Sequence, residues 1–207
     1  MVNEKILEFY EEFRDEVLGY VKENGHISTN TAFKALFLSY LTEAGETLVS
    51  DCTLVDFKKD GENMKLDGYA FSEYFHSLTL LVSKYQAKPQ PEKVKKTEID
   101  RLLKKALKFY KTCGTDSFEA LEESSDGYQA YEFIKAHKED IETVNIILLT
   151  NDETIQYIPE DTRQMCIRDR YFAFLCTLNI QSSTAYVPWC LNSLFLSGIM
   201  AFHSWLT

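Results

Sequence analysis

The sequence predicts an α/β (α+β) fold, in which helices pack on a mixed sheet made of an antiparallel three-stranded meander and one returning strand. Two observations lead to this fold class. The elements follow the order helix, helix, three strands, two helices, strand. The last strand is reached through a helical crossover, which brings it back to the sheet. A chain of 207 residues, with 45% hydrophobic and 26% charged residues, can build one such domain around its own core.

Four stretches carry helical signals. In residues 3–25, NEKILEFYEEFRDEVLGYVKENG, apolar side chains recur at helical spacing until Gly25. A second helix is expected over TAFKALFLSYLTEAGE, and Ser28, Thr29 or Asn30 can cap its start. Two further helices are expected at residues 94–113 and 117–138.

Four stretches carry strand signals. The meander is predicted from TLVSDCTLVDF, NMKLDGYAF and SLTLLVSKYQ, and Asp60 with Gly61 gives a tight-turn signal between the first two. The returning strand is VNIILLTN, residues 144–151, a continuous apolar run of the kind that is buried on both faces of a sheet.

This order of elements resembles the core of the restriction-endonuclease-like fold. In that family, carboxylates hold a divalent metal beside the scissile phosphate, and a lysine orients the attacking water. The resemblance implies a helix glutamate at Glu43 or Glu46, an aspartate at Asp67 and a lysine at Lys84. These catalytic candidates include three metal ligands for Mg²⁺, namely Asp67, Glu43 and Glu46. The strand position for another acid holds Val82, which cannot bind a metal.

The same residues also have a purely structural interpretation. Asp67 with Gly68 is typical of a turn or bulge, and Lys84 can extend its ammonium group into solvent from an edge strand. The two glutamates can simply solvate a helix end. If the metal site exists, Asp56 in the neighbouring strand can assist it.

Several short segments together resemble the N-terminal domain of abortive infection phage resistance proteins, the AIPR family. They are AFKALFLSYLTEAGE, KLDGYAF, SLTLLVSKYQ and IETVNIILLTND, within residues 10–155. The resemblance implies a bacterial antiviral defence protein, truncated before a large C-terminal region, with a nuclease-like, Mg-dependent or degenerate phosphodiesterase site. The alternative is a non-catalytic interaction or sensing module of a larger defence protein.

Charge bears on the expected partners. The net charge of −10 does not support binding to nucleic acid, so we expect a protein partner or the missing C-terminal region instead. The lysine-rich run at residues 88–108 is either a local basic patch or a solvated helix face. The charged N-terminus has no apolar signal region, and five cysteines form no metal or disulfide pattern, so we expect a cytoplasmic protein with reduced thiols.

The composition changes at residue 164, which predicts a domain at 1–163 and a tail at 164–207. Residues 171–207 contain no Lys, Arg, Asp or Glu. The segment MCIRDR at this boundary resembles the translation of a transposon-based sequencing adapter, which indicates an artefactual, chimeric tail. The alternative is a natural tail whose residues 185–202 form a poor membrane span, interrupted by Pro188. We expect no membrane attachment.

Overall fold

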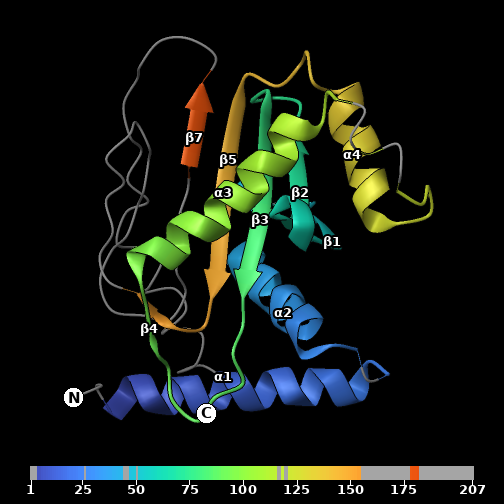
Figure 1. The fold of residues 1–207 in the computed structure, drawn as a ribbon. Helices are drawn as coiled ribbons and strands as arrows, with labels where there is room; N and C mark the ends of the chain where they lie inside the picture. The colour runs from blue at the N-terminus through green and yellow to red at the C-terminus, as the bar shows by residue number, and fades with distance from the viewer. Residues whose placement is uncertain are drawn as a thin grey trace.

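The computed structural model has a mixed sheet with helices on both of its faces (Figure 1). It describes residues 4–25, 27–43, 47–49, 51–115, 118, 121–154 and 178–181. The sheet order is β1-β2-β3-β5-β7, and a separate short pair is formed by β4 (Lys93–Val94) and β6 (Glu153–Thr154). The predicted α+β class with a mixed sheet is confirmed.

The two N-terminal helices agree closely with the prediction. Helix α1 spans Glu4–Glu23, and Gly25 follows it in the left-handed conformation with φ 74°. Helix α2 spans Thr29–Glu43. Ser28 caps it, because the Thr31 N–H donates to Ser28 Oγ over 3.0 Å. Phe13 of α1 packs edge-on against Phe33 of α2, with ring centroids 6.0 Å apart, so these helices form one layer.

The meander and the crossover strand also form as predicted. Strands β1 (Thr53–Lys59), β2 (Met64–Ser72) and β3 (Ser77–Lys84) pair antiparallel in sequence. Strand β5 (Thr143–Thr150) lies parallel to β3 along its whole length. Strand β7 (Leu178–Gln181) pairs antiparallel with β5. Central strand β3 therefore has a neighbour on each side.

Two boundaries differ from the prediction. Residues Thr47–Val49 form a short 3₁₀ turn, so β1 starts later than its apolar pattern suggested. Helix α3 spans Lys96–Thr112 as expected, but α4 is restricted to Asp126–Ala136. It starts there because the Ser125 hydroxyl accepts the Tyr128 N–H and caps the first turn.

Two hydrophobic cores occupy the two faces of the sheet. One core joins α3 and α4 to the side chains of Leu78, Leu80 and Val82 on β3. The other joins α1 and α2 to Leu81 on the same strand. Helix α4 lies so close to β1 that a Cβ at Gly127 would stand 2.1 Å from the Phe57 ring. Alternate residues of β3 therefore point to different helical layers.

The tail proposed from composition falls mostly outside the described residues. This applies to the boundary at residue 164 and to the apolar stretch 185–202. Among the helices that the structure does describe, none combines the length and the apolar character needed to cross a bilayer.

Candidate functional site

Asp67 lies in the interior, with both carboxylate oxygens bonded. Its side chain has no exposed surface. Oδ2 accepts the Ser83 N–H over 2.6 Å and lies 2.9 Å from Lys65 Nζ. Oδ1 lies 3.4 Å from Lys34 Nζ. Two lysines and one backbone amide therefore surround a single buried carboxylate.

Lys34 reaches this carboxylate from α2. The residue stands at helical spacing with Leu38 and Leu41 on the buried face of the helix, and only 1% of its side chain is exposed. Its ammonium group also donates to Val55 O over 2.8 Å. The sequence prediction missed Lys34. A lysine placed within the apolar stripe of an amphipathic helix was the available signal, because a buried charge requires a partner.

Strands β2 and β3 separate at Asp67. The last backbone pair toward this end joins Gly68 to Leu81. Beyond it, the Ser83 N–H donates to the Asp67 carboxylate, and Lys65 Nζ donates to Ser83 O over 2.6 Å. Side chains of β2 thus take the place of backbone hydrogen bonds and satisfy both polar groups of a β3 residue.

The thiol of Cys52 lies beside this cluster without sharing its charge. Burial raises the pKa of Cys52 to about 12, although Lys34 and a backbone hydrogen bond act in the opposite direction. A Cβ at Gly68 would stand 3.2 Å from the Cys52 sulfur, so the thiol covers the backbone next to Asp67. The thiol is therefore neutral at physiological pH, and the carboxylate that pairs with the two lysines is that of Asp67.

The other predicted ligands do not join Asp67 among the described residues. Glu43 is exposed at the end of α2, where its carboxylate accepts the Ser39 hydroxyl over 3.1 Å. Asp56 is exposed on β1. Val82 is completely buried in the core under α3. Glu46 lies outside the described residues.

The surroundings of Asp67 do not fit a magnesium ion. Mg²⁺ binds near-octahedrally to oxygen ligands and keeps several waters, so it needs open space and carboxylates. Here two ammonium groups lie against one carboxylate that has no exposed surface. In the part of the chain that is described, no three His, Cys, Asp or Glu side chains are grouped as a metal site.

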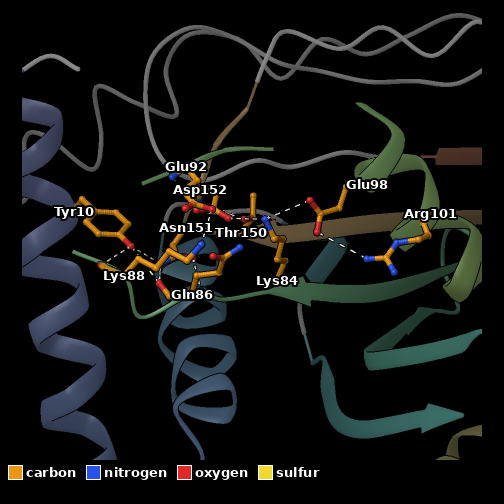
Figure 2. A network of polar contacts seen from close by, with 10 residues as sticks. All are labelled: Tyr10, Lys84, Gln86, Lys88, Glu92, Glu98, Arg101, Thr150, Asn151 and Asp152. Carbon is orange, nitrogen blue, oxygen red and sulfur yellow. Dashed lines mark hydrogen bonds and ion pairs between the residues drawn. The ribbon is translucent and has the colours of Figure 1, made fainter. Parts of the chain in front are cut away.

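Lys84 belongs to a second polar network at the same end of the sheet. Its ammonium group lies 2.7 Å from Asp152 Oδ2 and 3.6 Å from Glu98 Oε2, in the first turn of α3 (Figure 2). Asp152 is completely buried, whereas 16% of the Lys84 side chain is exposed. Asp152 Oδ1 accepts the Glu92 N–H over 3.1 Å. Asp152 therefore joins β3 to the segment that precedes α3.

Asn151 extends this network to α1. Its amide group exchanges hydrogen bonds with the backbone of Gln86, over 3.0 Å at the N–H and 2.8 Å at the carbonyl. It also donates to the Tyr10 hydroxyl over 3.3 Å (Figure 2). The signal for Asn151 and Asp152 was available in the sequence, since polar side chains directly after a buried parallel strand gather at one edge of the sheet. The sequence prediction did not use it.

Two of the predicted site residues, Asp67 and Lys84, thus belong to two separate centres. Lys34 and Asp67 lie between β2 and the α2 layer, whereas Lys84 turns toward α3 on the opposite side of the sheet. Each centre has one fully buried aspartate, which pairs with two lysines at Asp67 and with one at Asp152. Both hold separate segments of the chain together by charge-assisted hydrogen bonds.

Comparison with known proteins adds a family assignment. A family described as the abortive infection phage resistance protein N-terminal domain matches residues 33–171. No curated protein and no solved structure matches the chain. The matched region includes most of α2, and all of the meander, α3, α4 and β5. Because it covers well over half of the sequence, the chain belongs to the family of abortive infection phage resistance protein N-terminal domains.

Proposed function

We propose that this domain serves phage defence as a non-catalytic interaction module, in which Asp67 holds the sheet to α2. One observation carries the proposal: the Asp67 carboxylate is buried and bonded to Lys34, Lys65 and the Ser83 N–H. A metal-binding carboxylate must offer its oxygens to a cation and to an approaching phosphodiester. Here lysine ammonium groups take the position that a metal would need.

The charge of the chain supports the same role. A protein that cleaves DNA or RNA must first attract a polyanion, and a net charge of −10 opposes that attraction. The position corresponding to the missing acid is Val82, which packs in the core without any exposed surface. This part of β3 therefore packs against the helices of the core and does not line a site.

The alternative is a magnesium-dependent nuclease that uses Asp67, Lys84, Glu43 and Glu46. The observation in its favour is that Asp67 and Lys84 lie at the same end of neighbouring strands, where β2 and β3 separate. In that case Asp67 would be needed for cleavage itself, beyond its contribution to the fold.

A paired substitution distinguishes these two roles. In Lys34→Met with Asp67→Asn, both buried charges disappear together, and the asparagine oxygen can still accept the Ser83 N–H. Lys58→Met with Asp60→Asn makes the same change at an exposed ion pair and serves as the matched control. We expect both double variants to fold and to retain phage resistance in bacteria carrying the complete gene, measured by efficiency of plating.

A direct assay accompanies the plating experiment. The purified chain is incubated with plasmid DNA and with RNA, in Mg²⁺ or Mn²⁺, beside both double variants. We expect no cleavage above the level of the Lys34 and Asp67 double variant. The proposal fails if the wild-type chain cleaves and this folded variant does not, or if the variant alone loses phage resistance.

A further inference from the structure

The turn between β2 and β3 exposes two large aromatic side chains. Tyr74 is 86% exposed and Phe75 is 62% exposed, the highest values among large apolar side chains in the described residues. Their rings meet edge-on, with centroids 4.8 Å apart. Adjacent exposed aromatic rings form an apolar patch that water solvates poorly, and such patches commonly mark interaction sites.

The backbone of the turn that carries these rings is anchored to the rest of the fold through His76. His76 has φ 46°, a left-handed conformation that is uncommon for residues other than glycine. The N–H groups of Glu142 and Thr143 donate to His76 O over 2.8 and 3.2 Å, and His76 Nδ1 lies 3.2 Å from Asp140 O. The turn is therefore attached to the loop before β5. Because its backbone is already ordered, binding a partner there would cost little additional backbone conformational entropy.

Exposed carboxylates lie on the turn itself and on the loop that is hydrogen-bonded to it. We define the hairpin tip as residues 73–76 together with residues 139–142, which are bonded to each other through His76. Its exposed acidic side chains are Glu73, Glu139, Asp140 and Glu142. The neighbouring Lys138 directs its ammonium group to Cys113 O, 3.2 Å away. The described part of this surface therefore combines apolar rings with negative charge.

We propose that the hairpin tip docks a basic segment of a partner protein, one that carries arginine or lysine beside an apolar side chain. The rings would contact the apolar and cationic groups, and the carboxylates would pair with the remaining positive charges. Phosphate backbones and anionic membranes are repelled by the same carboxylates. The inference rests on the proposed interaction role, and it names the surface and the chemistry of the partner.

A defined probe tests this surface. The probe is a synthetic peptide of alternating arginine and leucine, and its control replaces every arginine with glutamate. We expect the wild-type chain to bind the arginine peptide in a fluorescence anisotropy titration. Tyr74→Ser with Phe75→Ser should weaken binding by about tenfold or more, since aromatic anchors commonly dominate such contacts. Leu18→Ser removes an exposed apolar side chain on α1 and should leave affinity unchanged.

A second variant tests the acidic side chains. Glu139→Gln with Glu142→Gln should weaken binding and reduce its dependence on salt, whereas Glu122→Gln with Glu123→Gln, also exposed, should not. The inference is overturned if the tip variants bind as well as wild type, if the glutamate peptide binds equally, or if vesicles of phosphatidylcholine and phosphatidylglycerol bind through Tyr74 and Phe75. None of these variants alters Asp67 or its partners, so a failure here is separate from any cleavage that depends on Asp67.

Discussion

The two ends of β3 differ in what they bury and what they expose. At its C-terminal end, charged side chains are buried and bonded, with Asp67 and Asp152 both completely hidden from solvent. At its N-terminal end, the hairpin tip leaves Tyr74 and Phe75 exposed. Buried charges with satisfied partners maintain a particular arrangement of segments, while exposed aromatic rings contribute little to the fold. The first end is therefore built for structure and the second is available for a partner.

The largest expected effect is at Asp67. Asp67→Ala leaves Lys34 buried without its carboxylate and removes the acceptor of the Ser83 N–H. Breaking one side of such a buried pair lowers the free energy of unfolding by about 3–5 kcal/mol. Urea denaturation followed by circular dichroism measures this loss. The double variant Lys34→Met with Asp67→Asn should recover much of it, because the fully buried Lys34 charge is removed with its partner, while the partly exposed Lys65 keeps the Ser83 carbonyl as acceptor.

A surface pair provides the comparison for this measurement. Asp60→Ala removes the partner of Lys58, and both of these side chains are mostly exposed. The expected change in the free energy of unfolding is much smaller than at Asp67, since exposed ion pairs contribute little. Equal losses at Asp60 and Asp67 would contradict the structural role assigned to the buried carboxylate.

An intermediate effect is expected at Asp152. Asp152→Ala removes the partner of Lys84 and the acceptor of the Glu92 N–H. Lys84 is partly exposed and keeps Glu98 nearby, so solvent can compensate for some of the loss. We expect the free energy of unfolding to fall by about 1–3 kcal/mol in the same urea experiment. Asp152→Asn keeps an acceptor for Glu92 and should lose less; a loss as large as that of Asp67→Ala would remove the distinction between the two centres.

The sequence predicted elements whose signals are local. Gly25 ends α1, Ser28 caps α2, and the apolar run of β5 lies parallel to β3. The start of α4 was wrong, since helical residue types continue upstream but the cap that starts the helix is Ser125. Local hydrogen bonding decided that boundary.

The polar centres were harder to predict because their partners are distant in sequence. Lys34 and Asp67 are separated by 33 positions, and Lys84 and Asp152 by 68. A pattern of residue types identifies Asp67 and Lys84 as unusual, but only the packing of α2 on the sheet determines that Lys34 reaches the carboxylate. Helical spacing identifies Lys34 as a lysine on the buried face of α2, but it does not say which carboxylate of the sheet this lysine meets.

The smallest effect on stability is expected at the hairpin tip. Tyr74→Ser with Phe75→Ser removes two large side chains that bury little surface, so the free energy of unfolding should change by less than about 0.5 kcal/mol. Phe109→Ala, in a residue with no exposed surface, should lower it by about 3–5 kcal/mol. Urea denaturation of both variants makes the comparison. A large loss of stability at the tip would mean that the aromatic pair supports the hairpin, and it would remove the contrast between the two ends of β3. Unchanged stability would mean that the exposed rings are not needed for the fold, which agrees with a role in binding.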